Sequence, residues 1–131
     1  MRRRVATASV AHLATVGAEG RPHIVPICFA LDEQTLYFAV DSKPKQTINL
    51  MRLRNIAVNP AVSILVDHYE DDWDRLWWVR LDGDARVVAD QGEVQRALRL
   101  LAARYSQYRA IAPAGPFVAV AIAGMTGWSA T

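Results

Sequence analysis

The turns that join the first apolar runs of this chain are too short for parallel strands. Gly17-Ala18-Glu19-Gly20 separates the run at 11–16 from the run at 23–31, and Asp32-Glu33-Gln34 separates the latter from 35–40. A parallel crossover needs a dozen or more residues, whereas a hairpin needs only a few. An antiparallel meander is therefore predicted, and a doubly wound parallel sheet is disfavoured.

The rest of the chain alternates strand patterns with two helical patterns. Asn59-Pro60 stops a helix of about ten residues. Asp90, with Glu93 three residues later, forms a capping-box variant before a second helix. About six antiparallel strands with two helices predict a mainly β, six-stranded split barrel, since closure hides strand edges. The later strands are expected at 61–69, at 76–89 with a bend at Asp82-Gly83-Asp84, and at 117–123.

Two prolines characterise the second strand. Pro22 and Pro26 lie in or next to the run at 23–31. Proline cannot donate a hydrogen bond to a neighbouring strand, so this strand is predicted to be an edge strand or to be bulged.

Length and charge limit the classes of function. The 131 residues, 52% of them hydrophobic, predict one domain over 1–131 with a real core. A net charge of +2 favours small anionic ligands over nucleic acid. No segment is long enough to cross a bilayer. Cys28 is the only cysteine and lies in an apolar run, which predicts a buried thiol, no intrachain disulfide and a reducing cytoplasm.

A cationic turn precedes the first predicted helix. Lys43-Pro44-Lys45 places two positive charges where a helix already carries partial positive charge. The arrangement suits a bound phosphate, because ammonium groups and helix N–H donors can converge on it. The alternative is a solvated loop with two ordinary surface lysines.

Three of the four tryptophans lie close together, at Trp73, Trp77 and Trp78. Adjacent residues in a strand point to opposite faces, so Trp77 and Trp78 cannot both enter the core. Core packing, a subunit interface and a ring-stacking site are the three interpretations.

No nucleophile or metal constellation is evident. His12, His23 and His68 match no metal-ligand spacing, and the acidic residues at 71–74 lack the pattern of a calcium loop. A cationic turn, an edge strand with free backbone groups and nearby aromatic rings would together suit a flavin-like cofactor.

The order of these motifs resembles the pyridoxamine 5'-phosphate oxidase-like split-barrel superfamily, over about residues 11–129. Within it, the segment from Asp67 to Arg80 is similar to an actinobacterial branch of oxidoreductases dependent on the deazaflavin coenzyme F-420. The motifs that carry the resemblance are ATVGAEGRPHIVP at 14–26, Lys43-Pro44-Lys45, Asn55-Ile56, NPAVS at 59–63 and LDGDA at 81–85.

The resemblance implies a homodimer with cofactor sites between subunits. Lys43 and Lys45 would bind the phosphate, together with Arg52 and Arg54. The distance from the Lys-Pro-Lys turn to the Asn-Pro stop is longer than in many relatives, which leaves open which cation meets the phosphate. The ring would lie near His23, Ile24, Val25 and Pro26, with Trp77 or Trp78 approaching from the partner subunit.

The implied reaction is hydride transfer between the deazaflavin and a small conjugated or quinone-like electrophile. His23, His68 and Tyr69 are the candidates for protonating the product. Two alternatives stay open: an FMN-dependent oxidase or reductase on the same barrel, and a module that binds flavin or heme without turnover.

Overall fold

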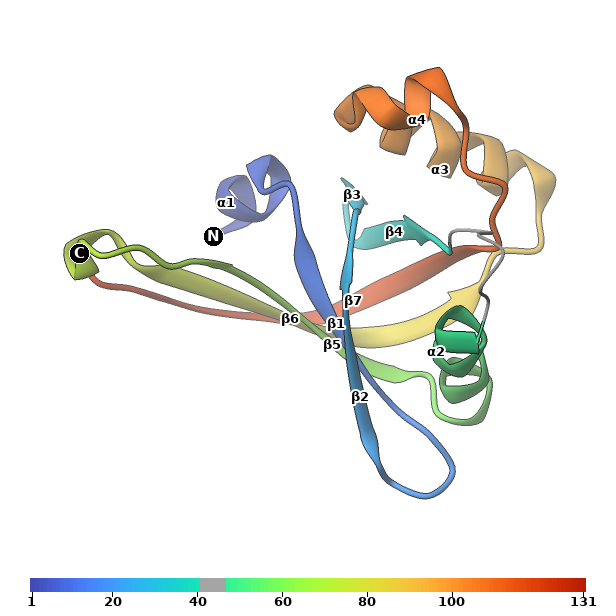
Figure 1. Ribbon diagram of the computed structural model, residues 1–131, viewed down its shortest axis with the longest axis horizontal. Coiled ribbons are helices and arrows are strands. Elements are labelled where there is room, and N and C mark those ends of the chain that lie inside the picture. Colours follow the sequence, from blue (N-terminus) through green and yellow to red (C-terminus); the bar gives the residue numbers. More distant parts are fainter. Residues whose placement is uncertain (41–46) are drawn as a thin grey trace.

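The computed structural model describes residues 1–40 and 47–131, with backbone alone for 47–50 (Figure 1). Lys43 and Lys45 lie outside the described residues. The elements in chain order are α1 (Arg2–Thr7), β1 (Ala11–Val16), β2 (Pro22–Ile27), β3 (Ala30–Asp32), β4 (Thr35–Ala39), α2 (Thr47–Val58), β5 (Ala61–His68), the single-turn helix η1 (Trp73–Arg75), β6 (Trp77–Val87), α3 (Gln91–Arg104), α4 (Ser106–Ala110) and β7 (Phe117–Ser129).

The strands form one antiparallel sheet in the order β2-β1-β5-β6-β7-β4-β3. Its two edge strands, β2 and β3, are consecutive in the chain and are joined only through Cys28 and Phe29. A two-residue link can reach from one edge to the other only if the sheet curls, and Figure 1 shows β2 and β3 following one another across the curled sheet. The mainly β split barrel is confirmed.

The predicted strand at 23–31 is in fact two strands, so the sheet has seven strands rather than six. Side chains from the end of α3 and its cap satisfy the backbone of Phe29 at the break. The Tyr105 hydroxyl accepts from the Phe29 N–H at 3.0 Å, and Arg104 donates to the Phe29 carbonyl at 2.7 Å. These bonds take the place of strand pairing at Phe29, so the chain can pass from one edge of the sheet to the other. The edge position that the prolines predicted for β2 is confirmed.

The core has two parts, one on each face of the sheet. The inner face buries residues from five strands that are at most 1% exposed: Leu13, Phe38, Ile64, Leu81 and Val120. The outer face is covered by α3 and α4 only near β3, β4 and the start of β7, where Ala97 and Leu101 of α3 belong to one buried cluster with Tyr37, Phe117 and Ala119 of the sheet. The remaining outer face, on β2, β1, β5 and the far half of β6, has no such cover within the described chain.

Helix α3 begins as predicted, with the Asp90 carboxylate accepting from the Glu93 N–H at 2.9 Å. Glu93 also joins the helix to the sheet. Both oxygens accept from Arg86 at 2.8 Å, and one accepts from the Tyr37 hydroxyl at 2.7 Å. The bonds from Arg86 and then Tyr37 lower the pKa of Glu93 to about 2, while burial and the bond to Glu93 raise the pKa of Tyr37 to about 12.

The bend predicted at Asp82-Gly83-Asp84 is a register shift between β6 and β7 at Asp82 and Gly83. A Cβ at Gly83 would lie 2.2 Å from the Ala121 carbonyl oxygen, so the close strand approach requires glycine. Beyond the shift, β7 continues past the predicted end at 123 to Ser129. The far ends of β5, β6 and β7 therefore extend away from α2, α3 and α4 as a long arm (Figure 1).

Candidate functional site

Strand β2 and helix α2 border two cavities. The His23 cavity, of about 390 Å³, lies between the β1–β2 hairpin and α2. The Cys28 cavity, of about 270 Å³, lies at the end of β2 and is lined by Val10, Pro26, Ile27, Cys28, Ala39, Arg52 and Tyr108. We call these two cavities together the β2–α2 groove. The volume of the His23 cavity is within the range of ligand pockets, which are commonly about 300–1,000 Å³, and that of the Cys28 cavity is just below it.

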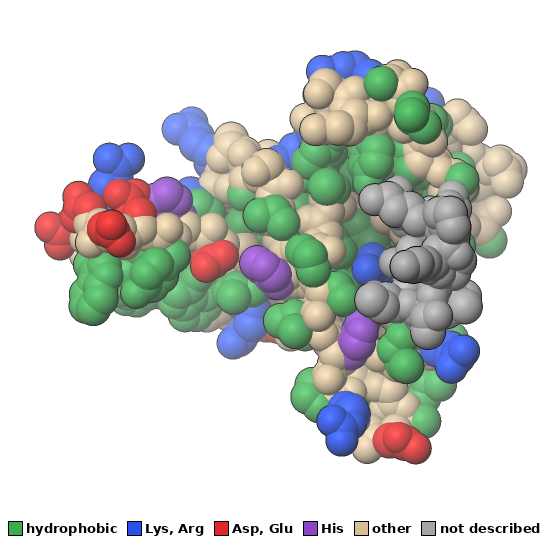
Figure 2. All heavy atoms as spheres, viewed as in Figure 1, with side chains coloured by type: hydrophobic (Ala, Val, Ile, Leu, Met, Phe, Trp, Pro, Cys, Tyr) green, Lys and Arg blue, Asp and Glu red, His purple; other side chains and the backbone are tan. Residues whose placement is uncertain are grey.

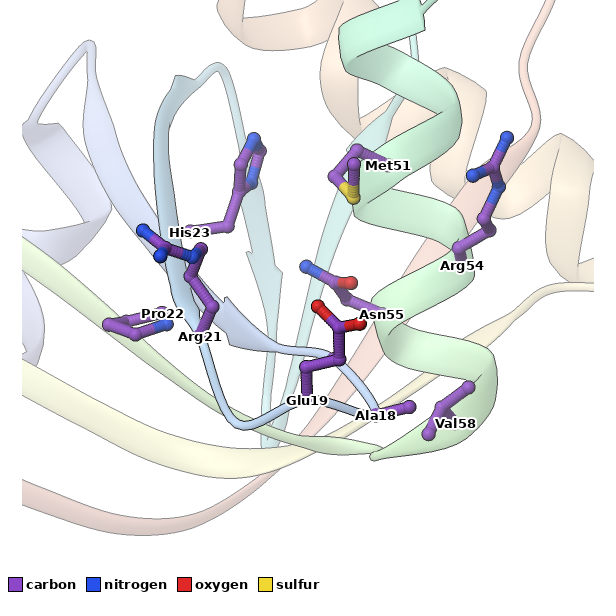
Figure 3. Close-up of a pocket in the computed structure, with 10 residues that line it drawn as sticks. Ala18, Glu19, Arg21, Pro22, His23, Met51, Arg54, Asn55 and Val58 are labelled. Atoms are coloured by element: carbon purple, nitrogen blue, oxygen red, sulfur yellow. The ribbon is translucent and has the colours of Figure 1, made fainter.

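The His23 cavity has apolar walls and a few polar groups. Figure 3 shows Glu19, Asn55, Met51 and His23 around it, with Arg21 and Arg54 on opposite sides. Met51, Arg54, Asn55 and Val58 recur at helical spacing and present one face of α2 to the hairpin. The predicted cation Arg54 therefore lies at this cavity, exposed at its rim.

His23 is the unusual side chain of the groove. Its Nδ1 atom is buried and has no hydrogen-bond partner in the part of the chain that the structure describes. Buried polar atoms are almost always satisfied, so a ligand or a water molecule is expected to complete this site. Because this nitrogen has no partner among the described residues, it is available to a bound molecule.

Arg52 lies at the other cavity. It is 8% exposed, its Nε is buried, and it lines the Cys28 cavity beside Pro26 and Ala39. A buried guanidinium beside an open cavity is suited to a phosphate or carboxylate group, since its fork of donors matches the oxygens of either. Cys28 is half-buried and borders the cavity, so the predicted buried core thiol is only partly correct.

The four β2 residues expected near the ring point to two faces, because β2 is a regular strand. His23 and Val25 pair with Thr15 and Leu13 on the inner face. Ile24, 64% exposed, and Pro26 point outward at the sheet edge. Only His23 and Pro26 of the four line the groove cavities.

The tryptophans gather at the other end of the molecule. We call residues 65–80 and 125–129 the tryptophan arm. It contains a cavity of about 390 Å³. Trp78 and Trp128 are cross-strand partners, and Trp78 also pairs with Asp67. Trp77 points to the opposite face and packs against the inner core. The cavity is lined by Leu65, Asp67, His68, Tyr69, Leu76, Trp77, Trp78, Arg80 and Trp128.

His68 and Tyr69, two of the expected proton donors, belong to this arm. The His68 ring is bonded to Glu70 and stacks on Trp77 with centroids 6.5 Å apart. Tyr69 is 71% exposed. Neither residue lines the β2–α2 groove of its own chain. The structure therefore brings together His23, Pro26, Arg52 and Arg54, and it separates them from His68, Tyr69, Trp77 and Trp78.

Charge is distributed unevenly over the surface. Figure 2 shows Asp and Glu side chains gathered at the end of the arm, next to a run of hydrophobic side chains.

Among the described residues, no cluster of three or more His, Cys, Asp or Glu could hold a metal ion. No helix in the described chain is both long and apolar enough to cross a membrane.

Two site residues were not anticipated from the sequence as part of the groove. Asn55 is 6% exposed, and its Nδ2 donates to the Thr15 hydroxyl at 3.0 Å. Gly17 lies directly beneath the Asn55 amide. The partner of Asn55 on the hairpin is visible only in three dimensions.

Solved structures with the same fold cover nearly the whole chain. The heme storage protein of Vibrio cholerae is 19% identical, with a TM-score of 0.73, and the match covers 95% of this chain and 89% of that one. An FAD-binding protein of Mesorhizobium loti is 23% identical, with a TM-score of 0.68, and covers 96% and 88%. At these identities the similarity shows the fold alone.

One relative matches in sequence over a shorter stretch. A 5a,11a-dehydrotetracycline/5a,11a-dehydrooxytetracycline reductase of Streptomyces rimosus is 38% identical over 55 residues, which is 42% of this chain. The match spans little more than a third of that reductase, 37% of its length.

The family comparison covers almost every residue. The model described as pyridoxamine 5'-phosphate oxidase matches residues 1–129. The curled antiparallel sheet of this chain is the split barrel that these solved structures share. The chain therefore belongs to the pyridoxamine 5'-phosphate oxidase family.

Proposed function

We propose that this protein is an oxidoreductase that transfers a hydride between deazaflavin coenzyme F-420 and a small conjugated or quinone-like electrophile. The observation that carries the proposal is the β2–α2 groove on a flavin-binding fold. This groove contains the buried cation Arg52 at one cavity and the unsatisfied imidazole of His23 at the other. The partial match to a reductase supports the same class of reaction.

The residues of the groove fit a flavin-type group. Such a group needs an apolar slot, a cation for its phosphate and few polar contacts for its ring. The slot has apolar walls at Pro26, Ile27 and Ala39, and Arg52 supplies a buried positive charge. Lys43 and Lys45 immediately precede α2 in the sequence and stay the predicted phosphate ligands.

Reduction of a conjugated acceptor adds one hydride, which carries both electrons and comes from the reduced cofactor when it is bound, and one proton. The chain has to supply the proton and exclude water. His23 is the groove residue with titratable nitrogen and no protein partner within the described chain, so we assign it the proton. Met51 and Val58 supply apolar lining on the same side.

We also propose that the protein acts as a homodimer. The outer face left uncovered by α3 carries exposed apolar side chains, including Ile24 at 64%, Leu65 at 36% and Trp128 at 49%. Apolar patches of this kind commonly mark interfaces. A partner docked there would bring a tryptophan arm, with its His68 and Tyr69, towards a groove. The half-buried thiol of Cys28 supports a reducing compartment, the cytoplasm.

A parallel titration with coenzyme F-420 and FMN, followed by ligand fluorescence, tests the proposal. Preferential binding of the deazaflavin supports it. Preference for FMN would indicate the FMN-dependent alternative, and binding of heme or flavin without reduction of any acceptor would indicate a binding module. Lys43→Ala with Lys45→Ala should weaken cofactor binding with little loss of stability. Unchanged affinity in that variant would remove the phosphate assignment.

A further inference from the structure

A single side-chain hydrogen bond joins α2 to the β1–β2 hairpin within the described residues. The Asn55 Nδ2 donates to the Thr15 hydroxyl at 3.0 Å, and Asn55 and Thr15 are 6% and 1% exposed. The amide oxygen, Oδ1, lies against Gly17 of the hairpin. A Cβ at Gly17 would lie 2.5 Å from the Asn55 Oδ1, so the amide occupies the space that any other residue at 17 would fill.

This contact lies between the two cavities of the groove. Asn55 lines the His23 cavity, and Arg52, one turn earlier on α2, lines the Cys28 cavity. This part of α2 also packs on the inner core through the buried Ile56 and the partly buried Leu53. Apolar packing resists separation but tolerates sliding, whereas a hydrogen bond fixes distance and direction. The Asn55 amide is thus the element that can set the separation of α2 from the hairpin.

We propose that Asn55 is a positioning residue for the cofactor groove. Its amide donates to Thr15 and occupies space that is open because residue 17 is glycine. In this position it fixes the width of the groove and the place of Arg52 in it. This inference rests on the proposed function for the identity of the ligand that the groove holds. Misplacement of a binding group by about 1 Å can reduce activity by about 100-fold, so a small shift of α2 would be measurable.

Three variants separate positioning from packing. Gly17→Ala should lower the Tm, because its methyl group collides with the amide. Asn55→Ala should lower the Tm by leaving a void and an unpaired Thr15 hydroxyl. In the double variant the new methyl group fills part of the vacated space, so the Tm should recover in part, while the Thr15 hydroxyl stays unpaired. We expect its affinity for coenzyme F-420 to stay at least about tenfold weaker than wild type, as for a lost positioning bond. Recovery of affinity together with Tm would overturn the proposal.

A second pair of variants changes only the hydroxyl. Thr15→Ser keeps the acceptor for Asn55 and should retain the affinity for coenzyme F-420, whereas Thr15→Val keeps the shape without the acceptor and should lose it. Equal affinities in the two variants would contradict a role for the bond. Gly124→Ala is the control, since a Cβ there meets no atom within 4 Å.

A readout without any ligand keeps the inference independent of the cofactor. Hydrogen exchange of the buried Arg52 Nε–H, measured by NMR, reports where α2 holds this side chain. We expect exchange to be at least about tenfold faster in Thr15→Val and in the double variant, and unchanged in Thr15→Ser. Unchanged exchange in all variants would overturn the positioning role. If exchange is faster in Thr15→Val but not in Thr15→Ser, and wild type binds no flavin or deazaflavin, the proposed function fails and the positioning role stands.

Discussion

The two ends of the molecule use histidine in opposite ways. In the β2–α2 groove, His23 has a buried Nδ1 without a partner among the described residues. In the tryptophan arm, His68 is bonded to Glu70 and stacked on Trp77. Arg4 covers the same indole, with its guanidinium carbon 5.3 Å from the ring centroid. A satisfied histidine stabilises the structure, whereas an unsatisfied one beside a cavity is available for chemistry.

The same contrast holds for the surroundings. The arm presents exposed rings such as Trp73, 67% exposed, and Trp128, 49% exposed, next to a cluster of acidic side chains. The groove presents a concave site with a buried cation, Arg52. Exposed aromatic surface favours association with another molecule's surface, while a concave site with a few polar groups favours a small ligand.

The largest expected effect is on turnover, and it tests the difference between the two histidines. His23→Ala should reduce the turnover of a conjugated acceptor by about 100-fold, as expected for loss of a general acid. His68→Ala should change turnover within about twofold, because its Nε2 is bonded to Glu70 and the residue lies outside the groove of its own chain. Steady-state rates with saturating cofactor measure both. A larger loss of turnover in the His68 variant than in the His23 variant would assign the proton donor to the arm instead of the groove.

The next effect concerns the register shift at Gly83, where the tryptophan arm meets the rest of the sheet. Gly83→Ala places a methyl group 2.2 Å from the Ala121 carbonyl oxygen, which is backbone and cannot move aside. We expect a loss of about 1–3 kcal/mol in the free energy of unfolding. Urea unfolding measures this loss. A stability equal to that of Gly124→Ala, whose methyl group meets open space, would show that the arm does not require the close approach.

Glu93 of α3 and Tyr37 beneath it make the free energy of unfolding depend on pH in a region apart from both the groove and the arm. Hydrogen bonds lower the pKa of Glu93 from 4.5 to about 2, so this stabilisation is complete above pH 4.5 and is lost as pH falls towards 2. The raised pKa of Tyr37, about 12, gives stabilisation that is complete below pH 10 and is lost as pH rises towards 12.

We expect the acid loss attributable to Glu93 to be on the order of 1–3 kcal/mol after allowance for solvent screening. Unfolding of Glu93→Gln should show a flatter pH dependence between 4.5 and 2 than wild type. Identical curves for the two proteins would mean that the carboxylate contributes nothing to holding α3.

The smallest expected effect is at the arm. Arg4→Ala removes the cation over the Trp77 ring and should lower the free energy of unfolding by about 0.5–1 kcal/mol. Arg3→Ala is the matched control, since Arg3 is exposed on the same helix and contacts no ring in the described structure. Thermal unfolding followed by tryptophan fluorescence measures both. Equal stability of the two variants would show that the Arg4 contact is not stabilising.

Local sequence signals predicted much of the fold because their causes are local. Prolines on β2, the Asp90 cap and the bend at Gly83 all depend on residues next to one another in the chain. The break at Phe29 could not be predicted in this way. It depends on Tyr105 and Arg104, 76 and 75 residues away, which reach the backbone only after α3 has packed on the sheet.

The site was predictable in part for the same reason. Residue type and strand position singled out His23, but they singled out His68 equally. Only packing distinguishes the two, because the partners of His68 and the lack of one for His23 are set by the fold. The pairing of Asn55 with Thr15, 40 residues apart, is a tertiary contact of the same kind.

The central claim is that the groove, and not the arm of the same chain, holds the cofactor. Mapping amide and indole chemical shifts by NMR during titration with coenzyme F-420, and in parallel with FMN, tests it most directly. We expect the largest changes at residues 23–28 and along α2, including Arg52, with any changes at the arm appearing only alongside them. Changes confined to the indoles of Trp77, Trp78 and Trp128, with the groove unaffected, would contradict the account.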